Sequence, residues 1–574
     1  MATTDIYGIW ERYNKSKTYM DKKGLLVKTE KSWQMYCGKQ WEAVEDSKGM
    51  EDLPMLNFIK PTVDYKVSTI AQHSVTALFS DMGGGKEPVT LPTGDMDEMG
   101  NYIPRVITPD EIIEKLNTLF AISWEKAKMN RVAWKNLKHC AIERDSYVYW
   151  GEGGDTRKSP QIIHNTQMHL GDENIVNIQD QPWIIIEERL EPALVRERAR
   201  LAGVSKKDID LIQPDKEMDT TLLNKEEVKG KVTSLLYLEK DIKTGIVSAG
   251  RCTKNVMYQP VKPIQQSKGG ELYETGLTMY PIVPMIWLEL PNDARGVSEV
   301  EQLIPNQLEL NKTLARRSIS IKMTAFPRVA YDDSMISNPD ALNKVGAAIK
   351  INGGGSQSIG NMITYLAPQA MSGDAKQLSD ELLNESRTLA GASDAQLGNI
   401  DLSRVSGTAA QTIRDQQQVP LNEQVSMYQD FVENVALLWF ELWKVYYPNG
   451  IDMDGIKISA EEIAAVEPNV RVDIAEDTTL SKMATQQELT NLFNNNKITF
   501  KEYATAYPEH ASIPKDVLMS IVQEREAQMA QGQVPVDDMG NPLEQPVDDS
   551  LGGGVNVGGA NAASYQAVQA SLAQ

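Results

Sequence analysis

The stretch 296–323, GVSEVEQLIPNQLELNKTLARRSISIKM, marks the point where the chain changes from mixed strand and helix to long helices. Ser298 followed by Glu301 is a capping-box pattern that begins a helix. Acidic residues come first and basic residues last, an order that complements the helix dipole. The stretch therefore predicts a helix over 298–323, with Pro305 expected to kink or restart it.

Strand-like and helical segments follow this helix. Residues 324–371 contain three strand-like runs, FPRVAYDD, GAAIKINGGG and MITYLAP, separated by Asn, Pro and Gly turns. GDAKQLSDELLNESRTLA, 373–390, predicts a second helix. The next segment, 391–405, is polar and weakly charged, and Gly391, Gly398 and Gly407 bound or flank its turns. Such a segment is typical of a loop.

A long helix is expected from Ser406, a good N-cap, to about Tyr447. Pro420 predicts a kink near Gln418. Apolar residues recur at alternating steps of four and three, which predicts a seam that packs against other helices. The seam consists of Leu421, Val425, Tyr428, Val432, Val435, Trp439, Leu442 and Tyr446.

The rest of the chain mixes the two kinds of structure. Residues 109–145 are strongly amphipathic and predict helix, and 175–290 alternate strand-like runs with one helical piece. Residues 451–475 are partly strand-like, and 480–530 predict two or three helices. The Gly-rich and Pro-rich tail, 531–574, predicts disorder. The fold class is therefore α+β.

Composition limits the function classes. A chain of 574 residues is long enough for several domains, and its net charge of −21 disfavours tight wrapping around nucleic acid. The acidity fits either simple solubility or a surface past which DNA moves without adhering. No run of about 18 apolar residues occurs, and the N-terminus lacks a signal pattern, so we expect a cytoplasmic, non-membrane protein.

Motifs for catalysis or metal binding are weak. The glycine run 82–88, MGGGKEP, fails the phosphate-loop pattern because Ser80 replaces the first glycine and Glu87 follows Lys86. It predicts a flexible loop. Cys37, Cys140 and Cys252 lack metal-ligand spacing and are expected to be reduced and buried.

The histidines offer one near pair, in HNTQMHLGDEN, 164–174. His164 and His169 beside Asp172 and Glu173 suit either a metal or acid-base role or an ordinary polar loop, and the pattern favours the loop. We expect no cofactor and no metal site.

In the order of these elements the chain resembles the portal proteins of tailed bacteriophages and related viruses, over roughly residues 30–530. The phrases that carry the resemblance are YCGKQW, LPMLNFIKPTVD, WEKAKMNRVAWKNLKHCAIERDSYVYW, DENIVNIQDQPWIIIEER, YPIVPMIWLELPNDARGVSEVEQLIPNQLELNKTLARRS and SGTAAQTIRDQQQ.

The resemblance implies a ring-forming portal fold. It assigns 1–295 to a mixed wing, 296–323 and 372–390 to a two-helix stem, 324–371 to a small β-containing clip, 391–405 to a tunnel loop, 406–447 to a long kinked wing helix, 448–530 to a helical crown and 531–574 to a tail.

The implied function is a dodecameric channel at one capsid vertex, without catalysis, through which double-stranded DNA enters and leaves. The implied partners are other copies of the chain, the major capsid protein, the terminase large subunit, the head-tail adaptor protein and, during assembly, the scaffold protein. The implied location is the virion, and the host cytoplasm during assembly.

The resemblance also implies site residues. Asn399, Asp401, Ser403 and Arg404 would line the channel at the tunnel loop. Lys312, Arg316, Arg317 and Lys322 would meet DNA or capsid protein from the stem, or pair with acids of the neighbouring helix. Tyr331, Asp332 and Asp333 are candidates for the clip interface.

Two other function classes stay open at this point. A nucleic-acid motor or nuclease would need a phosphate loop or a carboxylate metal cluster, and the sequence shows neither motif. An acidic helical scaffold protein would need only the composition and the helices.

Overall fold

The protein was analysed as a computed structural model. The residues described are 5–41, 54–71, 73–81, 89–96, 102–151, 154–215, 230–268, 271–325, 328–331, 336–343, 348–351, 363–366, 374–391, 419–447, 449–453, 455–476, 479–495, 497–507 and 517–522. The chain forms two compact units, Met1–Ala475 and Glu476–Gln574.

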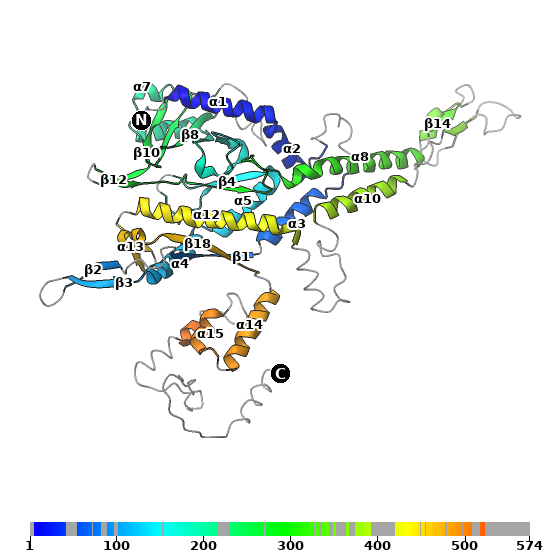
Figure 1. The fold of residues 1–574 in the computed structure, drawn as a ribbon. Coiled ribbons are helices and arrows are strands. Elements are labelled where there is room, and N and C mark those ends of the chain that lie inside the picture. Colours follow the sequence, from blue (N-terminus) through cyan, green and yellow to red (C-terminus); the bar gives the residue numbers. More distant parts are fainter. Residues whose placement is uncertain are drawn as a thin grey trace, which may run out of the picture. The chain divides into compact units, whose positions relative to one another are not determined.

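Two antiparallel sheets organise the first unit (Figure 1). The larger sheet has the order β10 (Met257–Pro263), β9 (Val247–Cys252), β8 (Val232–Lys240), β7 (Trp183–Leu190) and β6 (Met168–Leu170). The smaller sheet has the order β13 (Ile282–Ile286), β4 (Asp145–Tyr149) and β5 (Gln161–His164). Strands predicted between 175 and 290 are thus confirmed.

Alternating side chains of β7 bury the two faces of the larger sheet against different partners. Ile184 and Ile186 share a buried cluster with residues of the smaller sheet. Ile185 points to the other face and packs with Ile9 and Tyr13 of α1 (Ile6–Lys23). Both faces are therefore covered, which explains why the first half of this strand, residues 183–186, is a continuous apolar run.

Helices build the largest core of the unit. It joins α2 (Leu25–Cys37), α3 (Ile59–Ala71), α4 (Pro109–Lys126), α5 (Met129–Glu143) and α12 (Asn422–Tyr446). The helical prediction for 109–145 is confirmed, with a break at Lys128, whose φ of 54° lies in the left-handed region.

The seam predicted for the long helix is confirmed, since its members are buried or half-buried in the structure. Trp439 and Trp443 are fully buried, and the Trp443 Nε1 donates a hydrogen bond of 3.0 Å to Thr156. Pro420 lies in a short turn, η5 (Val419–Leu421), and α12 begins directly after it. The expected cap at Ser406 lies outside the described residues.

The two predicted helices on either side of residue 350 are confirmed as α8 (Glu299–Ala325) and α10 (Asp374–Leu389). They lie side by side (Figure 1). Between them in the chain, β14 (Arg328–Tyr331) pairs antiparallel with β15 (Ile363–Leu366). The run GAAIKINGGG contributes only an isolated bridge, Ile336 to Ile351, among the described residues.

Smaller elements complete the first unit: β1 (His73–Asp81) paired with β18 (Pro468–Glu476), β2 (Val89–Met96) with β3 (Tyr102–Ile107), β11 (Gln265–Lys268) with β12 (Glu271–Gly276), β16 (Ile451–Met453) with β17 (Ile456–Ile458), and the helices α6 (Pro192–Leu201), α7 (Lys206–Ile209), α13 (Ala460–Ala465), η1 (Asn165–Gln167), η2 (Ile178–Asp180) and η3 (Pro339–Asn343). Ile451, Ile458 and Ile463 join the large helical core.

The second unit contains α14 (Thr479–Asn494), α15 (Phe500–Ala506) and a helical segment at 517–522. Its small core includes Ala504, Tyr507, Leu518 and Val522. At least two of the helices predicted for 480–530 are therefore confirmed.

Gly296 is required where the chain turns from β13 into α8. Its φ is +67°, and a Cβ there would lie 2.2 Å from the Leu288 carbonyl oxygen. We expect Gly296→Ala to lower the free energy of unfolding by about 2–4 kcal/mol, because left-handed strain and overpacking add. Gly203→Ala is the control: φ is +80° but nothing lies within 4 Å. Equal losses in urea unfolding would contradict the steric argument.

Candidate functional site

The candidate site is the pair of helices α8 and α10 with the β14–β15 hairpin, here called the arm. Its base is set by the first turn of α8. The Ser298 hydroxyl accepts a hydrogen bond of 2.9 Å from the Glu301 backbone N–H, as the capping pattern predicts. Glu299 and Glu301 then connect this turn to the body of the first unit.

Glu299 is the buried anchor of the arm. Its carboxylate accepts a hydrogen bond of 2.8 Å from the Lys66 ammonium of α3 and one of 3.0 Å from the Trp287 Nε1–H. Side chains of Lys66 and Glu299 are each only 8% exposed, so this ion pair is shielded from solvent. Charge and hydrogen bonding thus hold α8 against α3 in a fixed register.

Glu301 binds two further cations at the base. Arg144 lies 2.5 Å and Lys28 3.0 Å from its carboxylate oxygens. Burial alone would raise the pKa of Glu301, but the Lys28 hydrogen bond and the Arg144 charge outweigh it and lower the pKa. Helices α2 and α5 are thereby joined to α8.

Buried amides continue the attachment about two and three turns further along α8. The Gln307 side chain accepts a hydrogen bond of 3.1 Å from the Phe58 backbone N–H and donates one of 2.6 Å to the Leu56 carbonyl. The Asn311 side chain accepts 3.1 Å from the Leu56 N–H. These amides satisfy backbone groups just before α3. α8 is continuous through Pro305, so the predicted restart does not occur.

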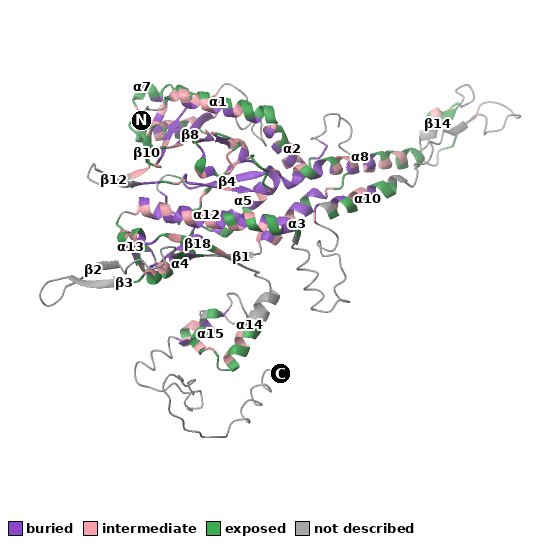
Figure 2. Ribbon diagram, viewed as in Figure 1, coloured by how far each residue is buried: buried purple, intermediate pink, exposed green. Residues whose placement is uncertain are grey.

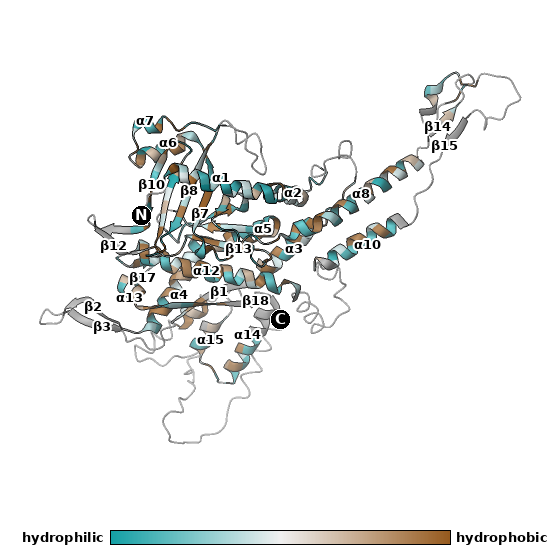
Figure 3. Cartoon of the chain, turned by 45° about the horizontal axis from the view of Figure 1, so that its top comes forward, coloured by the Kyte–Doolittle hydropathy of each residue, from teal (hydrophilic) through white to brown (hydrophobic). Residues whose placement is uncertain are grey.

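The distal half of α8 leaves the core. Figure 2 shows burial giving way to exposure along the helix. Ile319, Ile321 and Met323 are 38%, 60% and 45% exposed, and Leu378 of α10 is 45% exposed. Figure 3 shows hydrophobic residues recurring along α8 as far as this half. Ile319 and Met323, four residues apart, share one face of α8, and exposed apolar side chains grouped in this way are typical of an interaction surface.

Charge on the arm differs between its two helices. α8 carries the predicted site residues Lys312, Arg316, Arg317 and Lys322, whereas the exposed ionisable side chains of α10 include Asp380, Glu381 and Glu385. Arg316 lies 3.5 Å from Glu309 of its own helix, an exposed pair. Within the described part of the chain, Lys312, Arg317 and Lys322 have no ion-pair partner. The interpretation that they pair with acids of the neighbouring helix therefore stays a prediction, which a contact between two copies of the chain would satisfy.

Other predicted site residues lie at the end of the arm or outside the described residues. Tyr331 ends β14 opposite Ile363 and is 40% exposed. Asp332 and Asp333 lie outside the described residues, as do the glycine run 82–88 and the predicted loop residues Asn399, Asp401, Ser403 and Arg404. The structure neither groups nor separates these loop residues.

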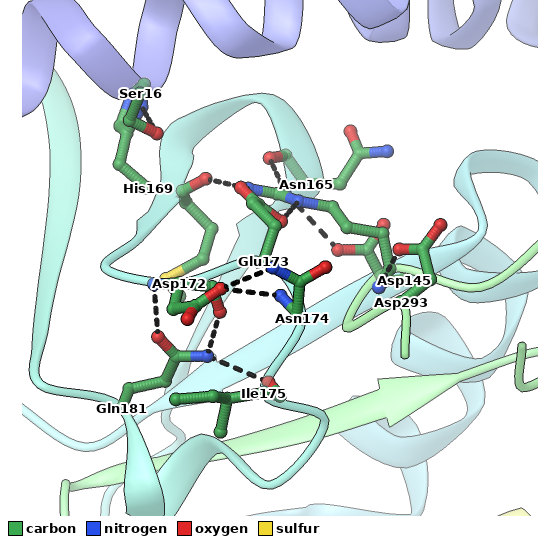
Figure 4. Close-up of polar contacts among 12 residues, drawn as sticks. Ser16, Asp145, Asn165, His169, Asp172, Glu173, Asn174, Ile175, Gln181 and Asp293 are labelled. Carbon is green, nitrogen blue, oxygen red and sulfur yellow. Dashed lines mark hydrogen bonds and ion pairs between the residues drawn. The ribbon is translucent and has the colours of Figure 1, made fainter. Parts of the chain in front are cut away.

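Arg295, directly before the base of the arm, is buried and is held by a polar network. Figure 4 labels three members of this network, Asp145, Asn165 and Glu173. Arg295 binds Glu173 through two hydrogen bonds of 2.8 and 2.9 Å, and donates 2.8 Å to each of the carbonyls of Asn165 and Met168. Burial raises the pKa of nearby Asp145 to about 6, although the Arg295 charge 3.5 Å away opposes the shift.

The predicted pair of histidines is not a pair in the structure. His169 is buried, 3.2 Å from the Ser16 hydroxyl and 3.6 Å from Glu187, while Glu173 is engaged by Arg295 (Figure 4). His164 instead lies with His139 and Glu143 of α5. The spacing of residues within 164–174 could not reveal this group, because two of its members lie on another element. The HxxxE spacing on α5 was the available signal, because it places His139 and Glu143 on one helical face.

The three cysteines are free, as predicted, and Cys140 and Cys252 are buried. Cys37 is exposed, so the prediction that all three are buried is wrong. It is the last residue of α2, where the chain turns away through Gly38.

No helix among the described residues combines the length and apolar character needed to cross a membrane. Comparison with known proteins finds no matching family model and no matching curated sequence.

Removing Lys66 tests the buried anchor. Lys66→Met should lower the free energy of unfolding by about 3–5 kcal/mol, because it leaves the Glu299 carboxylate buried without its cation. Adding Glu299→Gln should restore most of this loss, since the amide still accepts from Trp287. Lys60→Met, at an exposed position of α3, is the control, with a change below about 1 kcal/mol. Equal losses for the single and double variants, in denaturant unfolding, would contradict the assignment.

Proposed function

We propose that this chain is a portal subunit that forms a closed ring at one capsid vertex, through which double-stranded DNA enters and leaves. The proposal starts from the order of elements and the phrases quoted above. The observation that supports it best is the arm, which is fixed by a buried base and ends in an exposed, partly apolar half.

The charges of the arm favour contact with a second copy of the chain. Arg317 and Lys322, which have no ion-pair partner within the part of the chain that the structure describes, lie on α8, and Glu381 and Glu385 lie on α10. If α8 of one subunit meets α10 of the next, opposite charges come together beside Leu378 and beside Ile319 and Met323, which share one helical face. The two contacting surfaces then differ, so the interface is heterologous. A heterologous contact closes into a ring when its rotation fits.

The net charge suits a conduit. Twelve acidic chains around one axis would repel a DNA backbone more than they would hold it, and a passage needs low affinity. In this proposal the β14–β15 end of the arm is where the terminase and later the head-tail adaptor bind, and the wing contacts capsid and scaffold proteins. The chain itself performs no catalysis.

Reversing charges on α8 tests the assembly. Arg317→Glu with Lys322→Glu should raise the protein concentration needed for half-maximal assembly at least about tenfold, equivalent to 1.4 kcal/mol, because like charges would then meet. Adding Glu381→Lys and Glu385→Lys should restore assembly. The control reverses the exposed Lys206 and Lys207 of α7. Native mass spectrometry and negative-stain images measure the ring population.

A closed ring that tolerates the α8 reversal would contradict this interface while leaving the portal proposal intact. A monomer that hydrolyses ATP or DNA with a metal ion would overturn the portal proposal itself and favour a motor or nuclease.

Deleting residues 399–404 tests the channel separately from assembly. We expect rings to form as in the wild type, while DNA packaging or retention falls, because the deleted loop would line the passage. A matched deletion of six residues in the 531–574 tail is the control. Loss of ring formation on deleting 399–404 would contradict the assignment of this segment to the channel.

A further inference from the structure

Three side chains meet where α5 ends and β5 ends. His139 and Glu143 lie one turn apart on α5, and His164 is the last residue of β5. Their ligand-type atoms lie within 4.8 Å of one another. Two imidazoles and one carboxylate are a donor set that proteins use for zinc.

The three distances bring the donor atoms close to the spacing that a bound metal ion requires. His139 Nδ1 lies 3.3 Å from His164 Nδ1 and 3.3 Å from Glu143 Oε1. Zinc bonds of about 2.0–2.1 Å in a tetrahedron place neighbouring ligand atoms about 3.3–3.4 Å apart. The third edge, His164 Nδ1 to Glu143 Oε1, is 2.7 Å and needs only a small opening.

We propose that His139, Glu143 and His164 bind a divalent transition-metal cation of the zinc class, with a fourth position open to water. This inference is independent of the proposed function, since it rests on other residues and needs no ring.

The surroundings of Glu143 support the assignment. The Trp33 Nε1–H donates a hydrogen bond of 2.8 Å to Glu143 Oε1. The Asn165 side-chain amide donates one of 2.7 Å to the backbone carbonyl of Glu143. Outer hydrogen bonds of this kind orient metal ligands. Its other oxygen, Oε2, is buried and has no hydrogen-bond partner among the described residues. Buried polar atoms are seldom left so, and a cation bound by both oxygens of this carboxylate would satisfy Oε2 as well as Oε1.

The site is accessible to solvent and lies beside the attachment of α8. The side chains of His139 and His164 are 22% and 35% exposed, so a cation can reach them, whereas that of Glu143 is fully buried. The residue after Glu143 is Arg144, which binds Glu301 at the base of the arm. A bound cation would therefore tie β5 to α5 directly beside the attachment of α8.

The test uses untagged full-length protein, because a histidine tag binds zinc. Isothermal titration with Zn²⁺ should show one site per chain, and Co²⁺ should give the visible absorption of tetrahedral coordination. Zn²⁺ should raise the melting temperature, and a chelator should reverse the rise.

Variants separate the ligands from the fold. His139→Gln and His164→Gln should each weaken Zn²⁺ binding at least about 100-fold, and Trp33→Phe about tenfold, as for loss of an outer partner. Lys135→Gln, at an exposed position of α5, should bind like the wild type. The inference is overturned if the wild type takes up no Zn²⁺, or if the His139→Gln/His164→Gln double variant, shown to be folded by circular dichroism, binds equally well.

Discussion

The buried ion pair between Lys66 and Glu299 is the contact on which the arm depends. A charged carboxylate away from water is costly unless it is paired and hydrogen-bonded, and Glu299 has both Lys66 and the Trp287 N–H. This requirement fixes one rotation and one register of α8 against α3. Apolar packing alone would tolerate several.

Apolar and polar contacts have different roles along α8. Val300, Leu303, Ile304 and Leu310 fill the core, which supplies most of the stabilisation from burial. The buried amides Gln307 and Asn311 and the Arg295 network instead satisfy backbone and carboxylate groups where loops meet the core. The base of the arm is therefore specific as well as stable, whereas Ile319, Ile321 and Met323 in its distal half are exposed.

Such a division suits an assembly subunit. The part that must keep its geometry is held by contacts within the chain, while the part that would meet neighbours carries exposed apolar side chains and helices of opposite charge. The cluster of His139, Glu143 and His164 lies next to the same base, because Arg144, the residue after Glu143, binds Glu301.

The sequence by itself determined the local elements, because periodicity, caps and turns act over a few residues: α8 begins at its Ser298 cap, α10 follows the hairpin, and the apolar seam of α12 is buried. Partners distant in the chain came only from the tertiary structure. Lys66 lies 233 residues from Glu299. His164 joins His139 rather than His169, and Cys37 lies exposed at a helix end. Neighbours of this kind depend on how sheets and helices pack, and no spacing along the chain encodes that packing.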